Sequence, residues 1–179
     1  MVTFRTAAVT EDSSVTLLTE YFASRAQSFP AGMGEYRTAF PSPTQFVPPR
    51  GVFLIVQDDT PRPGAGDENG VDAAASAPAD VGCGGIRLLD HSAGVTRFEV
   101  KHLWLQPHLR GRGFGRLLLE ELESRARAFG ASEVVLDTNV AQEAAAGLYR
   151  NAGYVEIAAY NDNPNATHWF AKNLTTELE

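Results

Sequence analysis

The sequence contains one cysteine, Cys83, and no long apolar run. A single cysteine excludes an internal disulfide and leaves no CxxC pair for a structural zinc site, so we predict no metal centre. No apolar stretch approaches the roughly 18 residues that a membrane-spanning helix needs, and the first residues lack the apolar segment of a signal peptide. We therefore expect a cytoplasmic location, in a reducing environment, with no membrane insertion.

Positive charge is also scarce, since 15 Lys and Arg stand against 22 Asp and Glu, for a formal net charge of -7. Such a balance repels a polyphosphate backbone, so nucleic acid is not an expected partner. The 179 residues are 44% hydrophobic and 21% charged, which is typical of a globular chain of about one domain. We interpret residues 1–179 as a single domain.

In the first half, a long irregular loop is expected between regular elements, because residues 30–50 hold five prolines and two glycines. One helical turn is predicted near residues 34–39. Residues 58–80 are rich in Asp, Ala, Gly and Pro, with too few apolar side chains to offset the entropy of ordering, and we predict a flexible hairpin tip there. The other patterns predict strands at 3–9, 51–57 and 81–89, and a helix at 11–29.

The second half is more regular. Its patterns predict strands at 96–105, 133–137, 154–159 and 168–174, a helix that ends at Gly130, and a helix at 142–152. This order indicates an α/β fold of the mixed α+β type, with one βαβ unit. We expect a mixed, mostly antiparallel sheet of six to seven strands, flanked by helices.

A glycine-rich run, Arg110 to Gly115 (RGRGFG), joins a predicted strand to a predicted helix. Unpaired amides at the start of a helix point toward a ligand, and the helix dipole favours negative charge there. Glycines let a phosphate group approach the backbone. The run therefore predicts an anion-binding site.

The RGRGFG run resembles the R/Q-x-x-G-x-G/A signature of the GCN5-related N-acetyltransferases (GNAT). The preceding strand matches that family's E-x-x-x-Φ-x-Φ pattern (Φ apolar) at Glu99, Leu103 and Leu105. A second family motif, N-x-x-A-x-x-L-Y followed by G-F/Y, is matched by Gln142, Ala145, Leu148, Tyr149, Gly153 and Tyr154. Gln142 stands where the family usually has Asn, and Asn139 offers another side-chain amide. The resemblance covers residues 81–174.

The resemblance implies acetyl-CoA as the acetyl donor, held in a split between the fourth and fifth strands of a GNAT-like sheet. It implies N-acetyl transfer to a primary amine of a small molecule or peptide, by direct attack with general base help. The cofactor-binding residues it implies are Leu103, Trp104, Leu105, Arg110, Gly111, Arg112, Gly113, Phe114, Gly115, Arg116, Asn139, Gln142 and Tyr149.

Two residues are catalytic candidates from the same resemblance. Glu99 is at the position where many members use a glutamate as the general base, and Tyr149 resembles the tyrosine that protonates the CoA sulfur. The alternatives are an ion pair of Glu99 with Lys101 or Arg97, and a core-packing role for Tyr149. Strand alternation predicts that Glu99 and Lys101 share one face and that His102 lies on the other.

Two other functions stay open. A dinucleotide-binding oxidoreductase would also place glycines after a strand, although Arg116 replaces the third glycine and only one βαβ unit is predicted. A non-catalytic acyl-CoA sensor on the same fold is the second alternative. The acceptor is expected over residues 29–50 and 160–168, where carboxylates beside aromatic rings suit a small cationic amine: Glu35, Tyr36, Tyr160, Asp162 and His168. The oligomeric state is open, with a homodimer as one arrangement.

Overall fold

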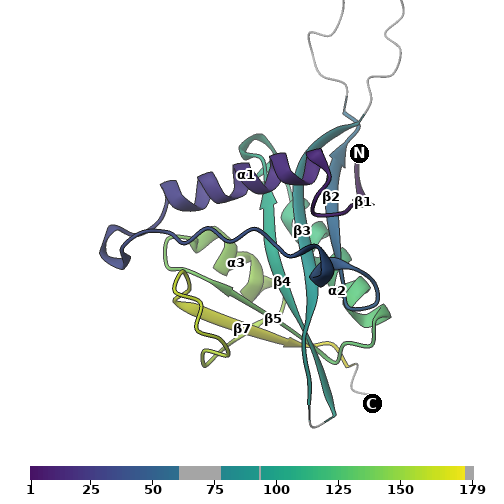
Figure 1. Ribbon diagram of the computed structural model, residues 1–179, viewed down its shortest axis with the longest axis vertical. Helices are drawn as coiled ribbons and strands as arrows, with labels where there is room; N and C mark the ends of the chain where they lie inside the picture. The colour runs from purple at the N-terminus through teal and green to yellow at the C-terminus, as the bar shows by residue number, and fades with distance from the viewer. Residues whose placement is uncertain (61–77, 93, 176–179) are drawn as a thin grey trace, which may run out of the picture.

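The computed structural model describes residues 1–60, 78–92 and 94–175, which form one seven-stranded sheet in the order β1-β2-β3-β4-β5-β7-β6, with helices on both faces (Figure 1). The core contacts place α1 on one face and α2 and α3 on the other. The elements are β1 (Val2–Thr6), α1 (Asp12–Gln27), β2 (Gly51–Asp58), β3 (Ala79–Ser92), β4 (Val95–Leu105), α2 (Phe114–Ala128), β5 (Glu133–Thr138), α3 (Glu143–Asn151), β6 (Val155–Ile157) and β7 (His168–Asn173).

Every neighbouring pair of strands is antiparallel except β4 and β5, which confirms the predicted mixed, mostly antiparallel sheet. The parallel pair is short: only Arg97–Glu99 of β4 pairs with Glu133–Val135 of β5. Beyond Glu99 the two strands diverge, while β4 stays paired with β3 as far as Leu105. The predicted split between the fourth and fifth strands is therefore confirmed.

A β-bulge interrupts β4 within this split. Lys101 pairs with Gly85 and Trp104 pairs with Cys83, so that two residues of β4, His102 and Leu103, face the single residue between them on β3. His102 adopts a φ of 57°, in the left-handed region that few residues other than glycine occupy. The extra residue breaks the alternation of the strand.

Two apolar clusters hold the helices to the sheet. On one face, Leu118, Leu119 and Leu122 of α2 are buried against the strands, as their helical spacing predicts. On the other face, Leu17, Leu18 and Phe22 of α1 pack against β2, β3 and β4. Cys83 lies fully buried in this second cluster, where it packs as a small apolar side chain.

The region before β2 differs from expectation. The predicted helical turn at 34–39 is wrong; short 3-10 turns lie at Ala31–Met33 and Pro43–Phe46 instead. Each turn has a proline at or just before its start, Pro30 or Pro43, where a missing backbone N–H costs nothing. Gly34 ends the first turn with a φ of 85°. The predicted hairpin tip overlaps the ends of β2 and β3, and its centre, 61–77, lies outside the described residues. No described helix is long and apolar enough to span a membrane.

Candidate active site

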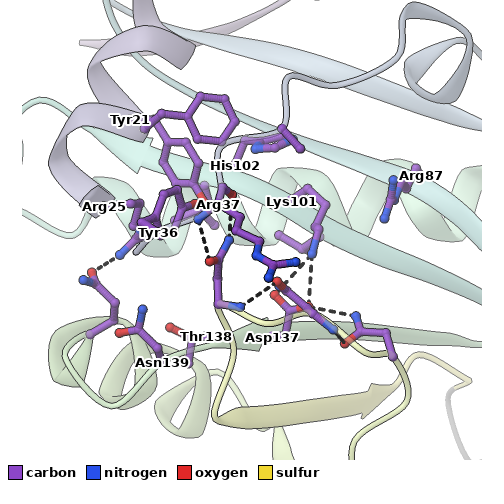
Figure 2. A pocket seen from close by; sticks show the side chains of 18 of the residues that line it. Tyr21, Arg25, Tyr36, Arg37, Arg87, Lys101, His102, Asp137, Thr138 and Asn139 are labelled. Carbon is purple, nitrogen blue, oxygen red and sulfur yellow. Dashed lines mark hydrogen bonds and ion pairs between the residues drawn. The ribbon is translucent and has the colours of Figure 1, made fainter. Parts of the chain in front are cut away.

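A cavity of about 350 Å³ lies where β4 and β5 diverge (Figure 2). Its walls come from β4, the end of β5, α1, the segment before β2 and the loop between β6 and β7. The residues that line it are Tyr21, Phe22, Arg25, Tyr36, Arg37, Ala39, Arg87, Val100, Lys101, His102, Leu103, Asp137, Thr138, Asn139, Gln142, Tyr149, Asn161, Asn163 and Asn165. The split in the sheet thus opens into a polar cavity with aromatic side chains on the α1 side.

Glu99 is fully buried beside this cavity, at the centre of a charge network. Arg87 of β3 holds its Oε2 with two nitrogens, at 2.8 and 2.7 Å. Its other oxygen, Oε1, lies 3.1 Å from Lys101 Nζ and accepts a hydrogen bond of 2.9 Å from the Tyr160 hydroxyl. Burial raises the pKa of Tyr160, and the charge of Glu99 adds to this, so the phenol stays a donor.

Lys101 links Glu99 to Asp137, which lies 3.1 Å away at the end of β5. Burial lowers the pKa of the Lys101 ammonium, but the two neighbouring carboxylates outweigh it and the net shift is upward. Burial likewise raises the pKa of Asp137, but Lys101 and hydrogen bonds from the loop asparagines bring it below its usual range. Both groups therefore stay charged at neutral pH.

These contacts surround Glu99, the predicted general base. Glu99 pairs with Lys101, one of the two partners expected if its role is structural. Arg97, the other expected partner, pairs with Glu133 instead. The side chain of Glu99 does not line the cavity, and donors occupy both of its oxygens. The role of Glu99 as general base stays a prediction.

Tyr149, the predicted acid, lines the cavity while its ring packs in the core. Its ring centroid lies 6.0 Å from those of Tyr154 and Phe170. Burial raises the pKa of Tyr149 to about 12, so the hydroxyl carries its proton at neutral pH. Core packing and a role as proton donor are therefore compatible in this side chain.

The two amide candidates both line the cavity, but they are held differently. Gln142 accepts a hydrogen bond from Arg25 and donates one of 2.9 Å to Ser28, so its side chain ties α3 to the end of α1. Asn139 is buried, and its Oδ1 accepts a hydrogen bond of 3.0 Å from the Ala141 amide, which fixes the turn before α3. Contact of either amide with a cofactor stays a prediction.

The glycine-rich run has the backbone that an anion site requires. Gly111 and Gly113 have φ values of 73° and 83°, and a Cβ at either position would meet nothing within 4 Å. Among the described residues, no side chain caps the start of α2. Of the three arginines predicted to bind the cofactor, Arg110 donates from Nε to the Leu105 carbonyl at 3.1 Å, and Arg116 pairs with Glu120. Arg112 lies over the Phe114 ring.

The loop before β7 contributes three alternating asparagines that no sequence motif marks: Asn161, Asn163 and Asn165. Asn161 donates to Asp137 at 2.8 Å and accepts from the Trp169 indole at 2.9 Å. Asn165 exchanges two hydrogen bonds with the backbone of Arg37. All three line the cavity, and the repeat of asparagine at every second position is the one sequence feature that sets this loop apart. The loop thereby fixes the segment before β2 against the end of β5.

His102 was expected on the opposite face from Glu99, and this is wrong because of the bulge. Its ring lies against aromatic rings on the α1 face, with centroid distances of 5.4 to 6.0 Å, namely those of Tyr21, Phe22 and Phe46. The same face holds the contact of Arg87 with Gln45. Burial lowers the pKa of His102 to about 3, and the charge of Lys101 acts in the same direction.

Comparison with known proteins decides the family. The model of the acetyltransferase (GNAT) family matches residues 30–154, well over half of the chain. This chain is a GNAT protein. Among curated GNAT relatives, the IAA acetyltransferase of Azospirillum brasilense is 43% identical over 76 residues, which are 42% of this chain and 48% of that protein. Human N-acetyltransferase 8B is 35% identical over 71 residues, or 40% of this chain and 31% of that protein. The matched segments thus span less than half of these relatives.

Solved GNAT structures show the same fold along nearly the whole chain. An acetyltransferase of the GNAT family from Staphylococcus aureus superposes with a TM-score of 0.68 at 14% identity, and covers 98% of this chain and 100% of its own. A chain of the NatC complex bound to Gag peptide and CoA superposes with a TM-score of 0.61 at 17% identity, and the match covers 97% of this chain and 99% of that chain. The single parallel pair of the sheet matches this fold and offers no support for a dinucleotide-binding one.

We predict that His102 makes the fold sensitive to mild acid. The unfolded chain binds a proton at histidine near pH 6.5, whereas native His102 does so only near pH 3, so stability is present above pH 6.5 and falls as the pH drops below it. Urea unfolding between pH 6.5 and 5 should show a slope of about 1 kcal/mol per pH unit from this group. His102→Asn, which tolerates a positive φ, should flatten the slope. The exposed His108→Asn is the control, and an unchanged slope in His102→Asn contradicts the assignment.

Proposed function

We propose that the protein transfers the acetyl group of acetyl-CoA to a primary amine. The observation that carries this is the free edge of β4: from Val100 to Leu105 the strand has no β5 partner, and this edge runs from the cavity toward the uncapped start of α2. An open strand edge recognises amide groups of a ligand by strand addition. An uncapped helix start recognises phosphates. CoA contains both kinds of group, the amides in its pantetheine arm and the phosphates in its pyrophosphate.

The residues present fit this donor. The backbone of Leu103, Trp104 and Leu105 would hold the pantetheine amides, and the amides of the glycine-rich run would hold the pyrophosphate. Gly115 lies close to Leu148 and Leu105, so α2 begins tightly against the end of β4. Acetyl-CoA is a substrate here, and it supplies an acyl group activated as a thioester.

The chemical step needs two proton movements. The amine nitrogen bonds to the acetyl carbon, the carbon–sulfur bond breaks, the nitrogen loses one proton, and the sulfur gains one. Tyr149 would donate the proton to sulfur, because it lines the cavity and is protonated at neutral pH. A backbone N–H near Leu105 would stabilise the carbonyl oxygen as it gains charge.

Loss of the amine proton is the other half of the step. Four cationic side chains line the cavity, namely Arg25, Arg37, Arg87 and Lys101. Nearby positive charge disfavours an ammonium ion, so the cavity itself would shift a bound amine toward its neutral, nucleophilic form. Glu99 would take the proton through a water molecule, because it does not line the cavity directly.

The first test is binding and turnover with the purified protein. Acetyl-CoA should raise the melting temperature, and NAD should leave it unchanged, because the recognised features are those of CoA. Addition of amines should release free CoA thiol, measured with a thiol reagent. Stabilisation by acetyl-CoA without thiol release for any amine would instead favour the acyl-CoA sensor. Equal stabilisation by NAD would contradict the donor assignment.

Tyr149→Phe should lower kcat on the order of a hundredfold and leave the acetyl-CoA dissociation constant nearly unchanged, because the hydroxyl acts only as the thiolate leaves. The ring packing against Phe170 is retained in this variant, so folding should persist. Tyr154→Phe is the matched control, since Tyr154 is also buried but does not line the cavity. Full turnover in Tyr149→Phe would return Tyr149 to a packing role.

The Glu99→Gln variant distinguishes a role of Glu99 as general base from a purely structural role as an ion-pair partner. The substitution leaves Arg87 and Lys101 short of a carboxylate, at a cost of about 3 to 5 kcal/mol, which lowers the melting temperature by about 10 °C. If Glu99 is also the base, kcat at pH 7 should fall about a hundredfold, and the loss should shrink as the pH rises and free amine becomes abundant. A pH-independent loss would leave only the structural role. Glu133→Gln, which breaks the partly exposed pair with Arg97, is the control.

A further inference from the structure

The cavity is basic although the protein is acidic. Its wall holds Arg25, Arg37, Arg87 and Lys101, and among the described residues Asp137 is the one acid in it. The whole chain has a formal net charge of -7. Of the residues expected to receive a cationic amine, Tyr36 lines the cavity, but the carboxylates of Glu35 and Asp162 do not. The electrostatic character of the wall is therefore opposite to the one that loop composition suggested.

Two of the four cations are already neutralised. Arg87 forms its bidentate pair with Glu99, and Lys101 bridges Glu99 and Asp137. Within residues 1–60, 78–92 and 94–175, no carboxylate lies within ion-pair distance of Arg25 or Arg37. Arg25 binds the Gln142 amide and lies over the Tyr21 ring, 5.1 Å from its centroid. Arg37 extends toward Lys101 and Asp137 (Figure 2).

These two guanidinium groups are in the wrong place for the phosphates of CoA. The glycine-rich run follows the carboxyl end of β4, and none of its residues lines the cavity. At about 3.3 Å per residue, Lys101 lies roughly 13 Å before Leu105 along the strand. With the pyrophosphate at the start of α2 and pantetheine along Leu103 to Leu105, Arg37 lies at the acceptor end of the site.

We propose that the acetyl acceptor is a primary amine that carries a carboxylate, as a free amino acid does, and that Arg37 with Arg25 binds this carboxylate. The proposal rests on the proposed function. A guanidinium group presents paired N–H donors that match a carboxylate, and a charge-assisted bond of this kind is among the strongest that a side chain makes. Tyr21, Phe22 and Tyr36 line the same side of the cavity and suit an apolar side chain on the acceptor.

The test compares matched acceptors that differ only at the acid. A panel of amino acids, their carboxamides and their decarboxylated amines is assayed with acetyl-CoA by thiol release, for example phenylalanine, phenylalaninamide and phenethylamine. The acids should be preferred to the amides at least tenfold in kcat/KM. A peptide N-terminus resembles the amide, so it should be a poor acceptor. The aminophosphonate analogue of phenylalanine distinguishes a planar carboxylate from another anion, and preference for the phosphonate would overturn the carboxylate assignment.

Variants locate the interaction. Arg37→Gln should raise KM for the acids at least tenfold more than KM for the amides, and Arg25→Gln should act in the same direction. Arg50→Gln is the control, because Arg50 is exposed and does not line the cavity. Calorimetric binding of N-acetylphenylalanine against its amide gives a readout that needs no turnover, and the preference for the acid should disappear in Arg37→Gln.

The failure of each proposal is distinguishable. If acetyl-CoA neither binds nor yields thiol with any amine, the proposed function fails. If amides and simple amines are acetylated as fast as the acids, the function stands and the carboxylate proposal fails. If Arg37→Gln weakens acetyl-CoA binding and leaves the acid preference intact, Arg37 belongs to the donor site and the proposal is overturned.

Discussion

The divergence of β4 from β5 after Glu99 is the constraint on which the rest of the structure depends. A sheet that separates exposes backbone groups and side chains that would otherwise be paired, and the cavity exists because of it. At the point of separation, alternating charges connect β3, β4 and β5: Arg87, Glu99, Lys101 and Asp137. Such a buried network is costly to break by removing one member, because the remaining charges are left without partners. The charged residues at the split are therefore also residues that hold the fold together.

The bulge at His102 is the second local feature with a wide effect. Without the extra residue, strand alternation would turn Lys101 and His102 to opposite faces. With it, both line the cavity, and His102 packs into the aromatic rings of α1 and the Pro43–Phe46 turn. Those contacts bring α1 over the split, where Arg25 reaches Gln142 at the start of α3. One residue in an unusual backbone conformation thus connects the sheet to the segment that covers the cavity.

The sequence predicted those parts of the protein that local patterns govern. Apolar periodicity indicates most helices and strands, and the glycines at Gly111 and Gly113 mark the start of α2. The sequence could not predict which residues surround Glu99, because its partners Arg87 and Tyr160 lie on other elements, 12 and 61 residues away along the chain. The positive φ of His102 has no local signature, so faces assigned by alternation fail beyond it. The charges of the cavity wall could not be predicted from the sequence either, because Arg37 comes from an irregular segment whose path is set by contacts with Asn165.

The basic cavity changes what the proposed chemistry requires of a base. An alkylammonium has a pKa near 10, so few molecules of a free amine are nucleophilic at neutral pH. Bound beside Arg25 and Arg37, an amine meets positive charge that disfavours its protonated form, while a carboxylate on the same molecule is attracted. One set of charges then serves both binding and activation. Under that arrangement the proposed chemistry needs a path for the amine proton, and because Glu99 is buried and does not line the cavity, a path to it would run through a water molecule.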